Sequence, residues 1–381
     1  MSEYQYYEFQ AIDRPLTEEE QRAVAELSSR VEPHPRRAVF TYSFGGDLRR
    51  RPRELVADYY DAMLYLANWG SRQLMFRFPK ALLDVAEVQQ YEVVTHEYPS
   101  NTVDVYTEGE HAILDIQLHE EGGLGWIEGE GWLDSLMSLR DAILQRDYRL
   151  LYLAWLKGVT LEFDVDEQAP EPPVPPGLQT LSLALENFVE LFGLDEDLIQ
   201  VAAERSGEVK KAASEEDLRR AIEQLAPEER DRFLLRLARG EPHLTLALNR
   251  RLGALAGLDS KPGEAAPRRT VGELFAAAKA QRERRRQEQK ARAEARRIAE
   301  FKALAGREDE TWREVDALIQ KSQAKPYDQA VQLLKRLRDL YRYQDRDAVF
   351  EGHMRQLCDL YSRRSALMRR LRQANLVPVD E

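Results

Sequence analysis

The densest group of chemically active side chains in this chain is basic. Residues 281–297, QRERRRQEQKARAEARR, hold seven arginines, one lysine and three glutamates. Guanidinium and ammonium groups at this density can bind nucleic-acid phosphates, an acidic protein surface or an anionic membrane surface. The side chains available for such contacts are Arg282, Arg284, Arg285, Arg286, Lys290, Arg292, Arg296 and Arg297.

The apolar pattern of this segment narrows the alternatives. Its only apolar residues are alanines, so it lacks both the repeat of a coiled coil and the large apolar face of a membrane-surface helix. Three oppositely charged pairs stand at i, i+4, and each stabilises an isolated helix by about 0.2–0.5 kcal/mol. These pairs are Arg284–Glu288, Glu288–Arg292 and Lys290–Glu294. They favour a solvated helix, while docking on an acidic protein surface and nucleic-acid binding stay open.

A second stretch whose residue types could perform chemistry is acidic and rich in glycine. It reads EEGGLGWIEGEGWLDS, residues 120–135, and it contains no basic residue, so phosphate binding is disfavoured. Its carboxylates could bind a divalent cation or perform acid–base chemistry. The residues in question are Glu128, Glu130 and Asp134. The composition favours the other interpretation, an acidic loop held against the core by Trp126 and Trp132.

Other catalytic or metal-binding patterns are missing. His111 and His119 are eight residues apart, which fits neither the strand nor the helix spacing of a metal site. The chain has no Gly-x-Ser-x-Gly turn, and its single cysteine, Cys358, lies in an apolar helical pattern typical of a core position. The sequence therefore predicts no catalytic residue, no cofactor and no metal centre.

The charge distribution separates the chain into acidic and basic parts. The net charge is -12, yet residues 268–303 carry +7 while residues 1–167 carry -15. The first residues show no secretory signal pattern, and no apolar run is long enough to cross a membrane. We therefore expect a cytoplasmic protein without membrane contact.

Periodicity predicts an α+β fold: an N-terminal domain with one sheet and helices on one face, followed by an all-helical half with one long basic helix. Alternating or aromatic-rich runs predict strands, and 3.6-residue periodicity predicts helices. The expected strands are 4–12, 37–44, 72–78, 91–98, 102–109 and 111–120. The expected helices of this domain are 16–30, 52–70 and 132–158, the last one continuous or broken.

Proline and capping signals set the predicted boundaries. Five prolines within residues 166–177 predict a linker after an acidic α+β domain at 1–165. The segments expected beyond it are a helical domain at 178–257, a linker at 258–269, a long basic helix at 270–303 and a C-terminal helical hairpin domain at 304–381.

Two resemblances accompany this organisation. The opening SEYQYYEFQAIDRPLT, the block YDAMLYLANWGSRQLMFRFPKAL, the linker PPVPPGL and the segment DEDLIQVAAE resemble a widespread family of uncharacterised bacterial proteins. That resemblance implies a bacterial cytoplasmic protein without implying an activity. The segment ETWREVDALIQKSQAKPYDQAVQLLKRLRDLYRY is similar to the helical tail of SWIM-type zinc-finger proteins. The finger itself does not carry over, because it needs several cysteines and this chain has one.

These observations predict a non-enzymatic protein-interaction or adaptor protein with a protein partner that the sequence does not identify. The first alternative is a nucleic-acid-associated accessory protein that uses the basic helix. The second is a divalent-metal-dependent enzyme built on the acidic glycine-rich loop. The sequence leaves the oligomeric state open.

Overall fold

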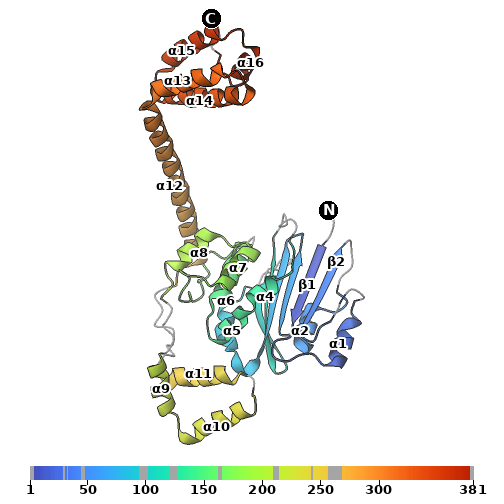
Figure 1. Cartoon of the computed structure of the whole chain (residues 1–381). Helices are drawn as coiled ribbons and strands as arrows, with labels where there is room; N and C mark the ends of the chain where they lie inside the picture. Colours follow the sequence, from blue (N-terminus) through green and yellow to red (C-terminus); the bar gives the residue numbers. More distant parts are fainter. Residues whose placement is uncertain are drawn as a thin grey trace. The chain divides into compact units, whose positions relative to one another are not determined.

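The computed structural model of the chain describes residues 4–28, 31, 33–43, 48–93, 102–120, 127–161, 165–208, 214–241, 243–255 and 268–377 (Figure 1). Contacts divide the chain into two compact units, residues 1–282 and 283–381. The α+β fold class predicted from the sequence is confirmed: a sheet with helices comes first, and helices follow.

Unit 1 is built on a six-stranded antiparallel sheet with the order β2-β1-β3-β4-β6-β5. The strands are β1 (Tyr4–Gln10), β2 (Arg37–Ser43), β3 (Ala62–Ala67), β4 (Ser71–Pro79), β5 (Thr102–Glu108) and β6 (His111–His119). Five of the predicted strands are confirmed. In the strand expected at 91–98, Val93 forms a single β-bridge to Val103. Residues 94–98 of that expected strand lie outside the described residues.

The helix predicted at 52–70 is wrong in its second half. Helix α2 (Pro52–Asp58) ends early, and the next residues form β3, which pairs with both β1 and β4. In β3 Met63 and Leu64 are both fully buried. A strand covered on both faces is apolar without alternation, and such a run cannot be told from a buried helix by periodicity.

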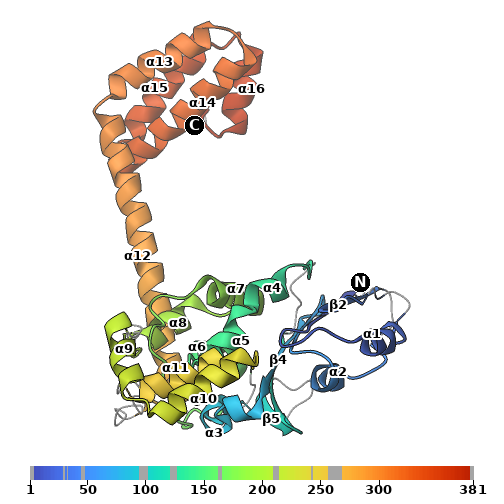
Figure 2. The same ribbon diagram turned by 60° about the horizontal axis from the view of Figure 1, so that its bottom comes forward.

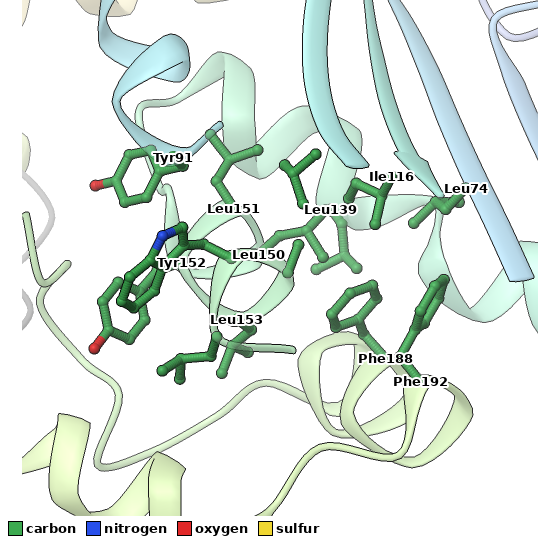
Figure 3. Close-up of a cluster of buried hydrophobic side chains, with 14 of the residues drawn as sticks. Leu74, Tyr91, Ile116, Leu139, Leu150, Leu151, Tyr152, Leu153, Phe188 and Phe192 are labelled. Atoms are coloured by element: carbon green, nitrogen blue, oxygen red, sulfur yellow. The ribbon is translucent and has the colours of Figure 1, made fainter. Parts of the chain in front are cut away.

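The helices cover both faces of the sheet, which corrects the expectation of one covered face. Met63 and Met75 enter a core with α1 (Glu18–Ala25) and α2. Their neighbours Leu64 and Leu74 enter the larger core on the other face. Figure 3 shows part of that larger core, with Phe188 and Phe192 of α7 turned toward the sheet. Adjacent residues point to opposite faces of a strand, so both faces here must be covered.

The other helices of unit 1 lie between the strands or after them. They are η1 (Lys80–Leu82), α3 (Val85–Val88), η2 (Gln89–Tyr91), α4 (Trp132–Leu136), α5 (Ser138–Leu144), α6 (Arg149–Thr160), α7 (Leu183–Phe192), α8 (Glu196–Ala203), α9 (Glu215–Glu223), α10 (Pro227–Ala238) and α11 (Leu244–Leu255). The stretch 132–158 is thus broken twice. Capping boxes are formed by Thr17 with Glu20 and by Thr270 with Glu273.

The proline-rich segment 166–177 lies against the core of unit 1. Within it Glu171, 2% exposed, pairs with Arg269 at 2.5 Å between Oε2 and Nε and also accepts a hydrogen bond from Tyr152. The larger core contains residues from both sides of this segment, among them Leu150 and Phe188. The contacts divide the chain elsewhere, after Arg282. The boundaries at 165 and 258 stay predictions about folding units.

Helix α12 (Val271–Ala305) starts in unit 1 and ends in unit 2. Unit 2 continues with α13 (Glu308–Gln320), α14 (Ala324–Tyr343), α15 (Asp347–Leu360) and α16 (Ser365–Gln373). Leu334, Leu337 and Tyr341 of α14 are fully buried in its core, and Cys358 is half-buried against it. No helix among the described residues is long and apolar enough to cross a membrane.

Candidate functional site

The basic segment predicted from the sequence lies on the exposed middle of α12. Every residue from Arg286 to Arg297 is exposed. Arg292 pairs with Glu288 at 3.9 Å, as predicted, while Arg297 pairs with Glu294 at 3.1 Å and Arg296 with Glu300 at 3.2 Å. Exposed pairs of this kind contribute about 0.3–0.5 kcal/mol each. The segment is therefore a solvated helix whose arginines are partly neutralised along its own length.

The first arginine of the segment behaves differently from the rest. Arg282 pairs with Asp195, the N-cap residue of α8, and its Nε lies 3.5 Å from Asp197, which is fully buried. Next to it Gln281 donates to Gln200 at 3.1 Å. Carboxylates at a helix N-terminus are favoured by the helix dipole, and Arg282 balances their charge. Arg282 thus fastens α12 to α8 inside unit 1 and has a structural role.

The acidic glycine-rich loop is only partly described, because residues 121–126, including Trp126, lie outside the described residues. Glu128 and Glu130 are exposed, and the exposed carboxylate of Asp134 accepts a hydrogen bond from Gln10 at 2.5 Å. Gly129 packs on the ring of Tyr6 so closely that an added Cβ would lie 2.1 Å from a ring atom. These contacts place the described part of the loop against the sheet.

Glu120, at the start of this loop, pairs with basic side chains that the sequence did not identify as its partners. Its carboxylate lies 3.2 Å from Nζ of Lys157 and 3.7 Å from Arg72, whose side chains are only 6% and 1% exposed. Lys157 also donates to the carbonyl of Gly193 at 2.9 Å, after the end of α7. Burial lowers the pKa of Arg72, against the opposing effect of Glu120. Glu120 is therefore a counter-ion for buried cations.

A second cluster of polar side chains connects Asp13, which follows β1, to His243, which precedes α11. Arg140 donates to both carboxylate oxygens of Asp13, at 3.0 and 2.8 Å, and Nε2 of His243 lies 3.3 Å from the same carboxylate. His243 has a φ of +57°, in the left-handed region. It borders a cavity of about 440 Å³ between α5 and α11, which Arg146 and Asp141 also line. This surface carries both acidic and basic side chains. Within the described residues no group of three metal-ligating side chains is present.

One carboxyl on the sheet has an unusual environment. Asp115 of β6 accepts a hydrogen bond from Gln73 at 2.8 Å and stands opposite Asp104 of β5. Burial raises the pKa of Asp115 to about 7; the hydrogen bond from Gln73 opposes this shift and the charge of Asp104 adds to it. Asp115 therefore holds a proton up to neutral pH. The alternating pattern of HAILDIQLH could have indicated that the polar Asp115 lies on an inner face of its strand. The sequence does not reveal which side chains cover Asp115.

A group of exposed leucines in unit 1 was also missed from the sequence. Helix α10 has no buried residue, and its side chains Leu234, Leu235 and Leu237 are 58%, 60% and 64% exposed. We name these three residues the α10 face. The run RFLLRLARG contained the signal, because consecutive apolar residues point in different directions on a helix and one neighbour cannot cover all of them.

Helices α9 and α11 share a small core next to α10. Ala221 and Leu225 pack on Leu252 in a small core, and α10 lies beside α11, as Figures 1 and 2 both show. On this side Glu229 binds Arg251 at 2.8 Å. Single exposed leucines are ordinary on protein surfaces, but three together on one helix indicate an interaction site.

No family model matches this chain, and no curated protein and no solved structure is significantly similar to it.

Proposed function

We propose that this chain is a non-enzymatic protein-interaction protein and that the α10 face is its contact surface. The observation that carries the proposal is the exposure of Leu234, Leu235 and Leu237 on a helix without a buried residue. Full burial of one leucine side chain contributes about 1.5–3 kcal/mol. Covering this face on a partner would thus supply several kcal/mol that the isolated chain leaves unused.

The remaining features of the chain agree with an interaction role. The polar groups at Asp13 and Glu120 are engaged in ion pairs that join elements of unit 1. Helix α12 belongs to both units, so one chain carries an α+β unit and a helical unit. An adaptor needs separate folded surfaces on one polypeptide, and this division provides them. The resemblance to bacterial proteins makes the bacterial cytoplasm the proposed compartment.

Affinity capture with three tagged full-length forms tests the proposal. The first is the wild type, the second carries Leu235→Glu and Leu237→Glu, and the third carries Leu183→Glu. Leu183 is 73% exposed on α7, so its substitution adds a charge at a matched exposed leucine away from α10. We expect a protein retained by the wild type and the control and lost with the double variant. Equal retention by all three forms would reject the α10 face as the contact surface.

Nucleic-acid binding by α12 is the second candidate function, and the exposure of residues 286–297 favours it. Its test is fluorescence anisotropy with labelled DNA and RNA at about 50 and 200 mM salt, because phosphate contacts release counterions and weaken steeply with salt. The variant should change Arg284, Arg286, Arg292 and Arg296 to Gln and leave Arg282 in place, since Arg282 fastens α12 to α8. Binding at low salt that this variant loses would support the candidate.

A further inference from the structure

We infer that the partner of the α10 face is a second copy of this chain, with the two α10 helices packed antiparallel. The inference rests on the proposed function and names the partner of the same surface. It follows from the order of charges along α10. Acidic residues occur only in its first turns, and arginines dominate beyond them.

The charges on α10 match those of an antiparallel copy. The acids Glu228, Glu229 and Asp231 lie within its first five residues, together with Arg230, whereas Arg232, Arg236 and Arg239 follow them. In a parallel pair acids would face acids and arginines would face arginines. In an antiparallel pair the acidic end of each helix faces the basic end of the other. Like charges across an interface are destabilising and opposite charges fix its register, so the antiparallel arrangement is selected.

One row of side chains defines the register. Asp231, Leu235 and Arg239 stand at i, i+4 and i+8, so they follow one another along the same side of the helix. With a two-fold axis at Leu235, Asp231 of each copy faces Arg239 of the other, and the two Leu235 side chains meet. Leu234, about 100° from Leu235 around the helix, borders this contact, whereas Leu237, about 160° from Leu235, lies outside it. The row is its own complement, as a symmetric dimer requires.

Other charges near α10 already have partners inside the chain. Arg236 binds Glu241 at 2.7 Å and Glu229 binds Arg251, and both pairs involve the side of α10 that is not the α10 face. Asp231 and Arg239 are both exposed, and among the described residues no ion pair involves either of them, although the charge of Arg239 also contributes to lowering the pKa of Glu241. Asp231 and Arg239 are therefore available to pair with a second copy, whereas Arg236 and Glu229 already have partners within the chain.

The size of the surface sets the expected affinity. Helix α10 has 12 residues, which is about 18 Å of helix. A standard stable interface buries about 800 Å² on each partner, more than one face of so short a helix can offer. We therefore expect a reversible dimer with a dissociation constant of about 10–100 µM.

Sedimentation velocity of the full chain between about 1 and 300 µM tests the inference, since this range brackets the expected dissociation constant. The wild type and the Leu183→Glu control should change reversibly from monomer to dimer. The Leu235→Glu/Leu237→Glu variant should stay monomeric. Because these leucines are 60% and 64% exposed, the substitutions should leave the fold intact, which circular dichroism checks.

Charge reversal tests the register. Asp231→Arg places arginine opposite Arg239 at both contacts, and Arg239→Asp places carboxylates opposite each other, so each single variant should dimerise about tenfold more weakly. An equimolar mixture of the two variants should regain wild-type affinity, because both contacts of the mixed dimer are then attractive. A variant that merely damaged the fold would not recover on mixing.

Three results would overturn the inference: a wild type that stays monomeric throughout, a dimer that survives the double leucine substitution, or a mixture that does not regain affinity. A monomeric wild type that still captures another protein through the α10 face would leave the proposed function standing and refute the second copy alone. A dimer dependent on the α10 face, with the mixing result, would establish both partner and register.

Discussion

Asp115→Asn should remove a large part of the pH dependence of stability in unit 1. Burial raises the pKa of Asp115 to about 7 in the folded chain, whereas an aspartate in an unfolded chain titrates near 3.9. Between these values the folded chain holds a proton that the unfolded chain has lost. Stability therefore falls as the pH rises from about 4 to 7 and levels off above 7.

The size of this pH effect on stability follows from the difference between the pKa values of Asp115 in the folded and the unfolded chain. Each pKa unit corresponds to 1.36 kcal/mol, so the wild type should lose at most about 3 kcal/mol between pH 5 and pH 8 through this group. Asparagine cannot ionise and keeps the shape of the side chain. We expect Asp115→Asn to gain about 2–3 kcal/mol more, relative to the wild type, at pH 8 than at pH 5.

Urea unfolding followed by tryptophan fluorescence measures this difference if Trp312 is first replaced by Phe. Trp312 is the only tryptophan in residues 283–381, so the remaining fluorescence reports on unit 1. Asp104→Asn is the matched control. It removes a neighbouring charge but leaves the burial of Asp115, the largest cause of the shift, so most of the pH dependence should remain. Equal pH dependence in the wild type and Asp115→Asn would refute the reasoning.

Two further substitutions test packing inside unit 1. Gly129→Ala should lower the unfolding free energy by about 1–3 kcal/mol, because its Cβ would overlap the ring of Tyr6; an unchanged urea midpoint would contradict this contact. Glu171→Ala should cost about 3–5 kcal/mol, because it leaves the guanidinium of Arg269, 5% exposed, without its carboxylate. Thermal unfolding of Glu171→Ala beside the exposed-residue control Glu215→Ala would show whether the loss is specific to the buried pair.

Much of the fold could be predicted because its signals are local. Strand β6 alternates, and Thr17 and Glu20 have the spacing that closes a capping box. Strand β3 could not be predicted, since its burial comes from helices on both faces of the sheet. The same limit explains the proline-rich segment: five prolines exclude a helix there, but only the fold brings Arg269 to Glu171.

The candidate sites divide in the same way. The sequence by itself determined the net charge of the α12 segment and the i, i+4 spacing by which Glu288 and Arg292 pair, since helix geometry alone places such residues together. Only the tertiary structure decided that Arg282 is fastened to α8, that Asp115 is half-buried opposite Asp104, and that the leucines of α10 are exposed. Each of these depends on which distant segments surround a side chain, and both burial and ion pairing are properties of those surroundings.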